Sequence, residues 1–159
     1  MKQEKFLEKI VINVGTGKIL QRPHFKEKIL PEILQNLAEI TGQHGAVRQA
    51  KKSISNFKTR TGDPVGIQVT LRGKRMESFF GKLINVVFPR VKDFRGIDLK
   101  SVDAMGNLNV GFREQYVFPE INMDHSNVNF GLQVTVVPII KDRDKAIDFY
   151  RSSHVPLKD

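Results

Sequence analysis

The stretch Val65-Gly66-Ile67-Gln68-Val69-Thr70-Leu71-Arg72 decides the fold. Its odd positions are all apolar branched residues, and its even positions are all small or polar. Such alternation is typical of a β-strand with one buried face and one exposed face. The sequence therefore predicts a sheet whose outer face is polar.

Basic residues concentrate around this strand. Between Arg48 and Arg75 the chain carries eight Lys or Arg residues and a single acid, Asp63. One basic group precedes the strand, in a segment whose Ser and Asn residues are typical of a loop, and the other group follows the strand. A basic loop beside a polar sheet face indicates a surface that binds a polyanion.

Composition predicts one globular domain over residues 1–159, with 40% hydrophobic residues and no low-complexity tract. The net charge of +9 is uneven: residues 1–100 carry 20 Lys or Arg against 9 Asp or Glu, and residues 101–159 carry 6 against 8. A localised basic excess most often indicates nucleic-acid binding, less often an anionic membrane surface, and in other cases only solvation.

The expected compartment is the cytoplasm, with no membrane partner. No apolar run approaches the roughly 18 residues that span a bilayer, and the first residues lead into no signal-peptide core. The chain has no cysteine, which excludes disulfides and thiolate metal sites.

Hydrophobic periodicity predicts the secondary structure. Strands are expected at residues 10–14, 46–50, 65–72, 107–118 and 130–140, and helices at residues 31–40, 74–88 and 142–151. Pro89 should stop or kink the second helix, and Asp142 should cap the last one. These elements do not alternate strictly, so we expect an α+β fold. Its mixed, mostly antiparallel sheet of about five strands should carry helices on one face and leave a polar face open for RNA.

The open face should present amide, hydroxyl, guanidinium and glycine positions. These are Asn13, Gly15, Gln68, Thr70, Arg72, Asn109, Gly111, Arg113, Gln133 and Thr135. Such groups bond to sugar and phosphate oxygens, and glycine lets a backbone approach closely. The alternative is an ordinary solvated sheet face, which would be expected to contain more Glu and Lys.

Catalytic and metal-binding patterns are not found. The segment Gly15-Thr16-Gly17-Lys18 lacks the further glycine of a phosphate-binding loop, the four His residues are scattered, and no Ser has a nucleophile context. We therefore expect no enzyme activity, metal or cofactor. A basic RNA-modifying enzyme and a non-specific module that binds DNA or a membrane surface are the alternatives.

Phe57 is the one aromatic residue inside the basic loop. It stands among Lys52, Lys58 and Arg60. Two interpretations carry equal weight: its ring stacks on a base or packs on a sugar, or it anchors the loop to the protein's own core.

Six ordered motifs carry a resemblance to a known family. They run from Lys9 to Gly15, Ile40 to Gln43, Ala50 to Lys58, Gly66 to Gly73, Phe88 to Gly96 and Phe118 to Ile121. In these stretches the chain resembles the universal large-subunit ribosomal protein L5 family, which binds 5S ribosomal RNA. The resemblance covers roughly 70% of the chain between its first and last motif.

The resemblance implies a structural protein of the large ribosomal subunit, in the cytoplasm. Its partners would be 5S rRNA, 23S-type rRNA and other proteins of the central protuberance. By position, Asn13, Gln43, Thr70 and Arg72 look like RNA-contacting residues. With the neighbouring positions that the charge and alternation patterns select, the expected 5S rRNA site is Asn13, Gly15, Gln43, Gln68, Thr70, Arg72 and Lys74.

Two further contacts are implied by the resemblance. The basic loop resembles the family's extended loop, which reaches toward P-site tRNA, and the segment after Pro119 resembles the part that bridges to a protein of the small-subunit head. The expected tRNA-contacting residues are Lys51, Lys52, Ser53, Asn56, Phe57, Lys58 and Arg60.

Overall fold

A computed structural model describes residues 6–53 and 60–158 of the chain. The strands are β1 (Leu7–Gly15), β2 (Ala46–Gln49), β3 (Pro64–Leu71), β4 (Leu108–Phe112) and β5 (Leu132–Pro138). They form one sheet in the order β2-β3-β1-β5-β4, and all four strand pairs are antiparallel. The expected α+β fold is therefore confirmed, although the sheet is antiparallel throughout these strands and not mixed.

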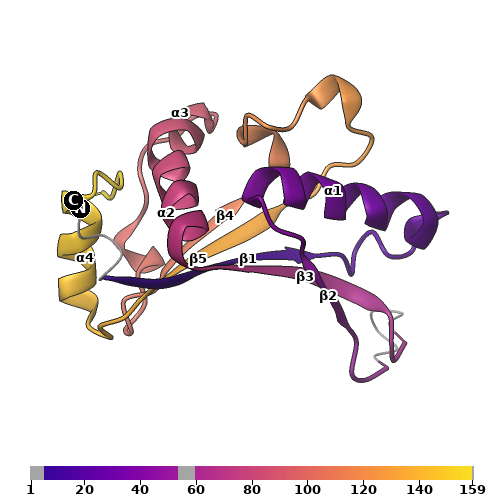
Figure 1. Ribbon diagram of the computed structural model, residues 1–159, viewed down its shortest axis with the longest axis horizontal. Coiled ribbons are helices and arrows are strands. Elements are labelled where there is room, and N and C mark those ends of the chain that lie inside the picture. The colour runs from indigo at the N-terminus through magenta and orange to yellow at the C-terminus, as the bar shows by residue number, and fades with distance from the viewer. Residues whose placement is uncertain (1–5, 54–59, 159) are drawn as a thin grey trace.

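The helices cover one face of this sheet (Figure 1). They are the π-helix η2 (Phe25–Ile29), α1 (Leu30–Thr41), α2 (Gly73–Lys82), the π-helix η4 (Leu83–Val87), α3 (Phe88–Arg90) and α4 (Arg143–Ser152), with 3-10 turns η5 (Leu99–Ser101), η6 (Gln115–Val117) and η7 (Met123–His125). Figure 1 shows α1 and α2 above the sheet, α4 at one end, and no described helix below it. One sheet face is thus left open, as expected.

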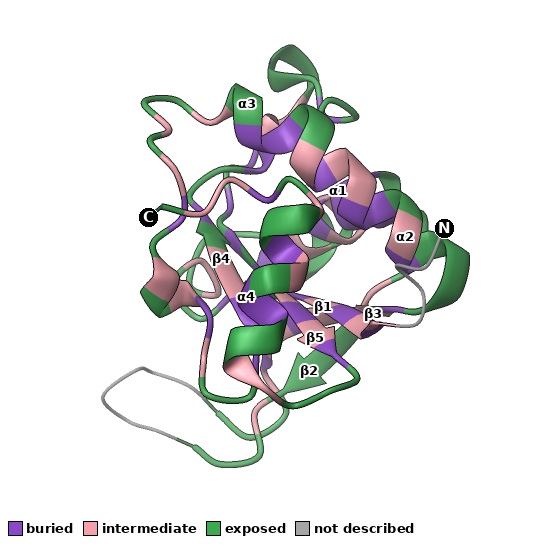
Figure 2. Cartoon of the chain, turned by 90° about the vertical axis from the view of Figure 1, so that its left-hand side faces the viewer, coloured by how far each residue is buried: buried purple, intermediate pink, exposed green. Residues whose placement is uncertain are grey.

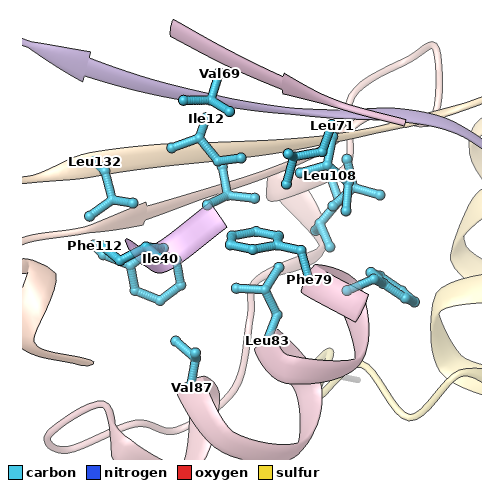
Figure 3. Packing of buried hydrophobic residues seen from close by; sticks show 14 of the residues in the cluster. Ile12, Ile40, Val69, Leu71, Phe79, Leu83, Val87, Leu108, Phe112 and Leu132 are labelled. Atoms are coloured by element: carbon cyan, nitrogen blue, oxygen red, sulfur yellow. The ribbon is translucent and has the colours of Figure 1, made fainter. Parts of the chain in front are cut away.

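The core fills the space between the sheet and α1 and α2. Figure 3 shows Ile12, Val69 and Leu108 on the strands facing Ile40 and Phe79 on the helices. All five are at least 98% buried. The residues between them in β1 and β3 are partly or fully exposed, so the period-two pattern of the sequence is confirmed. No described helix is both long and apolar enough to cross a membrane.

Helix boundaries follow the sequence signals closely. Gly42, with a φ of 76°, ends α1 in the left-handed conformation. Asp142 caps α4 by accepting a hydrogen bond from the backbone N of Lys145 at 3.1 Å. The helical run of α2, η4 and α3 extends from Gly73 to Arg90. It therefore includes Pro89 and ends one residue after it. The run widens into η4 just before Pro89, where the proline has no N–H to donate back along the helix.

The strand predicted at 107–118 was wrong beyond Phe112. The chain leaves the sheet there and forms η6. Gln115 is fully buried, and its amide donates to the carbonyl O of Val128 and accepts from the backbone N of Phe130 at 3.2 Å. A buried amide must find partners, and these partners lie on the far side of the 119–129 loop. Alternation alone does not reveal this requirement.

Candidate nucleic-acid interface

The open face of the sheet arranges its side chains in rows that cross several strands. The longest row runs from β2 to β4 through Ala46, Gln68, Asn13, Gln133 and Gly111. A second row joins Thr70, Val11, Thr135 and Asn109, and a third joins Arg48, Gly66 and Gly15. None of these positions is Asp or Glu, so nothing in the rows repels a phosphate.

Hydrogen bonds within the rows hold some of these side chains. Arg48 Nε donates to Gln68 Oε1 at 2.8 Å, and the hydroxyl of Thr135 donates to Asn109 Oδ1 at 2.9 Å. Asn13, between the two pairs, is exposed. The face is thus partly preordered and keeps an amide available at its centre.

Two glycines leave space for a close approach. An added Cβ at Gly15 or at Gly111 would have no heavy atom within 4 Å outside its chain neighbours. Both residues are exposed and lie in the rows. The surface at these positions is therefore flat backbone, which a sugar or base edge can reach.

The end of β3 leads directly into the N-terminus of α2, and this junction is basic. Arg72 is the N-cap residue, its side chain makes no capping hydrogen bond, and Gly73 follows with a φ of 61°. Lys74 and Arg75 occupy the first turn, which contains no acidic residue. Cations here oppose the helix dipole and lower helix stability. A bound phosphate would accept hydrogen bonds from the free N–H groups of the helix and neutralise the cations.

Gln43 connects this junction to α1. Its amide Nε2 donates to the carbonyl O of Thr70 at 2.9 Å, and its Oε1 accepts from Arg75 NH1 at 3.2 Å. Thr41 positions Gln43 in turn, because its hydroxyl oxygen accepts from the backbone N of Gln43 at 3.2 Å. The structure therefore brings Gln43, Thr70, Arg72 and Lys74 to one end of β3.

The basic loop leaves the sheet at the other end of β3. Its base is closed by hydrogen bonds of 2.8 Å from Ala50 N to Asp63 O and from Gly62 N to Ala50 O. Ser53 braces the loop by accepting from the backbone N of Thr61 at 3.1 Å. The described parts of this loop, residues 51–53 and 60–62, are exposed and lie at the edge of the protein below the sheet (Figure 2); we call these two stretches the exposed arm.

The predicted loop residues divide into two sets. Lys51, Lys52, Ser53 and Arg60 are exposed, as a polyanion-binding loop requires. Asn56, Phe57 and Lys58 lie outside the described residues.

The described basic residues of this region therefore do not form one patch: Lys51, Lys52 and Arg60 lie in the loop, Arg48 lies in the third row of the sheet face, and three others lie at the start of α2. The loop group precedes Pro64, and Arg72, Lys74 and Arg75 follow Leu71. An eight-residue strand of about 3.3 Å per residue separates them by about 25 Å. A folded RNA that contacts both would have to span the whole sheet.

Some residues of this face were not selected from the sequence. Arg48 belongs to the third row through its pairing with Gly66, and Val11 lies between Thr70 and Thr135 in the second. Arg48 was counted with the loop, because a four-residue edge strand gives too weak a pattern to assign its faces. For Val11 a signal was available, because alternation along β1 places it on the same face as Asn13 and Gly15.

The turn after β1 has a structural role. Thr16 is fully buried, and its hydroxyl donates to the carbonyl O of Pro64 while its backbone N donates to Val65 O at 3.0 Å. This turn therefore fixes the start of β3. Among the described residues no group of three His, Asp or Glu could hold a metal ion.

The segment after Pro119 is tied to the helices. Lys82 Nζ lies 2.6 Å from Glu120 Oε1 and also donates to the carbonyl O of Ile40. Glu32 Oε1 accepts from the backbone N of Asn127 at 2.8 Å. The turn η7 between these two anchors leaves Met123 62% exposed, so the loop presents one apolar side chain on a fixed backbone.

Comparisons with known proteins show the family of this chain. The family model for ribosomal protein L5 matches residues 2–60, and the model for the ribosomal L5 family C-terminus matches residues 64–156. The large ribosomal subunit protein uL5 of Halothermothrix orenii is 42% identical over 151 residues, which are 95% of this chain and 82% of the relative. The uL5 proteins of Roseiflexus castenholzii and Carboxydothermus hydrogenoformans are 43% and 44% identical, over 96% and 95% of this chain and 83% and 82% of the relatives. The chain therefore belongs to the ribosomal protein L5 family.

Proposed function

We propose that this protein is a structural component of the large ribosomal subunit that binds 5S rRNA with the open face of its sheet and the N-terminus of α2. Family membership places it among non-enzymatic ribosomal proteins of the cytoplasm. The observation that carries the RNA site is the basic start of α2: Arg72, Lys74 and Arg75 surround helix N–H groups that no side chain caps.

Affinity and selectivity come from different parts of this surface. The cations at the start of α2 neutralise phosphates, which makes binding strong and salt-dependent. Asn13, Gln68 and Thr70 offer neutral polar groups at fixed spacings along the rows, and these select a folded RNA by its shape and its 2′-hydroxyls. A duplex without the matching shape would make only the phosphate contacts to the cations and none of the contacts to the neutral polar groups.

Gln43 acts chiefly through its neighbours. Both ends of its amide are engaged with Thr70 and Arg75, and one donor hydrogen and one acceptor lone pair remain available. Gln43 therefore holds the end of β3 against the first turn of α2 and offers at most one bond of each kind to RNA.

The exposed arm is a separate site in this proposal. Lys51, Lys52 and Arg60 lie beyond the far end of β3, where they would contact P-site tRNA without touching the 5S rRNA surface. The segment from Glu114 to Gly131 contains no Lys or Arg in a chain of net charge +9, and therefore suits a basic protein partner better than RNA. That partner would be the small-subunit head protein, while 23S-type rRNA and neighbouring proteins complete the central protuberance.

A pair of variants tests the division between the two surfaces. Arg72→Ala should weaken 5S rRNA binding by about 1–3 kcal/mol, since a desolvated contact to a phosphate or base is lost. Lys52→Ala, a charge change of equal size on the arm, should leave 5S rRNA affinity almost unchanged and weaken tRNA-dependent translation. Equal losses of 5S rRNA affinity in both variants would contradict the proposal.

A further inference from the structure

An open cleft of about 840 Å³ lies beside the base of the exposed arm. One wall is the segment 20–27, which joins the turn after β1 to η2. The other wall is formed by Ser53, Arg60 and Asp63. The two walls are more than 25 residues apart in the sequence, so no local motif reveals the cleft.

Three cations that line the cleft have no ionic partner. Arg22, Lys26 and Arg60 are exposed, and within the described part of the chain no carboxylate oxygen lies within 4 Å of their charged groups. Two acids, Glu27 and Asp63, also line the cleft. Glu27 lies 3.8 Å from His24, and Asp63 Oδ2 accepts from the backbone N of Arg60 at 2.8 Å.

The cleft walls are held in place by buried and hydrogen-bonded residues. Phe25 is 96% buried and anchors the segment between Arg22 and Lys26. His24 adopts a left-handed backbone with a φ of 60°, and its carbonyl O accepts from Lys28 N at 2.9 Å, which starts η2. Across the cleft, the hydrogen bond from Thr61 N to the hydroxyl oxygen of Ser53 at 3.1 Å fixes the arm. The cations therefore project from a defined scaffold.

We propose that this cleft binds the phosphates of an RNA backbone. Three cations without an ionic partner around one open cavity match the charge of phosphodiester groups, and their N–H groups can donate to phosphate oxygens. Small-molecule pockets are mostly apolar and enclosed, whereas this cleft is polar and open, and its cations continue into Lys51 and Lys52 on the arm. The site extends the proposed function, since it rests on RNA binding by the chain and not on the position of 5S rRNA.

The salt dependence of RNA binding tests the cleft. The 159-residue chain and its double variant Arg22→Gln/Lys26→Gln would be titrated with 5S rRNA, with tRNA and with a large-subunit rRNA transcript over a series of salt concentrations. Each lost phosphate contact lowers the log-log slope by about 0.7–0.9, so for at least one RNA the double variant should reduce the slope by about 1.5.

A matched control lies at the opposite end of the molecule. Lys145 and Arg151 are exposed on α4, so Lys145→Gln/Arg151→Gln removes the same two charges far from the cleft (Figure 1). This control should leave all three slopes unchanged. Thermal unfolding of both double variants should match that of the parent chain, because all four side chains are exposed.

The outcomes separate the cleft from the sheet face. If the cleft variant behaves like the α4 control with all three RNAs, the proposal is overturned. A second experiment uses inorganic triphosphate as the ligand. If the parent chain binds triphosphate, the cleft variant does not, and no RNA shows a slope change, the cleft is a site for free phosphates and the proposal is also overturned. A parent chain without preference for 5S rRNA, but with a cleft-dependent slope on another RNA, would contradict the sheet-face proposal and support the cleft.

Discussion

The side-chain amide of Gln43 bridges the carbonyl O of Thr70, at 2.9 Å, and the guanidinium of Arg75, at 3.2 Å. Through this bridge, Gln43, which lies just beyond the end of α1, holds the C-terminal end of β3 against the first turn of α2. The guanidinium of Arg75 is therefore held in place without a ligand, and less conformational entropy would be lost if the start of α2 binds RNA as we propose.

Replacing Gln43 tests this preorganisation. Gln43→Met keeps the size of the side chain but removes both hydrogen bonds, so the free energy of unfolding should fall by about 1 kcal/mol. The affinity for 5S rRNA should fall as well. In a double-mutant cycle, Arg75→Ala should cost less affinity in the Gln43→Met background than in the parent, because the two residues act as a unit. Additive losses would show that Gln43 and Arg75 contribute independently.

Gly15 tests whether RNA approaches the sheet backbone closely. Its φ lies outside the left-handed region, and a Cβ would meet nothing within 4 Å, so Gly15→Ala should change folding stability by no more than about 0.5 kcal/mol. The added methyl group should nevertheless weaken 5S rRNA binding. Gly81→Ala on α2, where a Cβ also has open space, is the matched control and should leave affinity unchanged.

Lys82 joins three parts of the fold. Its Nζ pairs with Glu120 at 2.6 Å, donates to Ile40 O, and lies 5.3 Å from the ring centroid of Phe79. Lys82→Met should lower the free energy of unfolding by about 1–2 kcal/mol, measured by denaturant titration. Proteolysis within the 119–129 segment should become faster, since one of its anchors is lost. Unchanged cleavage there would show that Glu32 and Gln115 suffice to hold the loop.

Tyr150 closes the far end of the core. It is fully buried, and its hydroxyl donates to the carbonyl O of Gly106 at 2.6 Å; burial, together with the charge of Asp103, raises its pKa. Tyr150→Phe leaves that carbonyl without its partner and should cost about 1–3 kcal/mol of stability. Thermal and denaturant unfolding would measure the loss, and 5S rRNA affinity of the folded variant should not change.

Asp103 makes stability depend on pH. Burial acts to raise its pKa, but hydrogen bonds from Asn107 and from the backbone of Met105 outweigh burial and hold the pKa below its ordinary value of 3.8. A lowered folded-state pKa contributes stability that is present above 3.8 and is lost as the pH falls through the folded-state value. The stability advantage of the parent over Asp103→Asn should therefore shrink on acidification below about pH 4. A constant difference down to low pH would contradict this assignment.

Sequence alternation was sufficient to predict the sheet face but not the surfaces around it. The rows through Asn13, Gln68 and Gln133 follow from a period of two, because strand geometry alone fixes which residues share a face. The end of β4 was mispredicted, since Gln115 turns inward to partners that only the fold brings near. The cleft of Arg22 and Arg60 was not predicted for the same reason.

The most direct test of the central claim is the binding of the purified chain to 5S rRNA over a salt series, with an unrelated duplex RNA of equal length as competitor. The sheet face and the start of α2 predict a retained preference for 5S rRNA and a log-log slope of about −4, which corresponds to roughly five neutralised phosphates. Equal binding of both RNAs at every salt concentration would contradict the account, because the basic surfaces would then bind any polyanion without recognising shape.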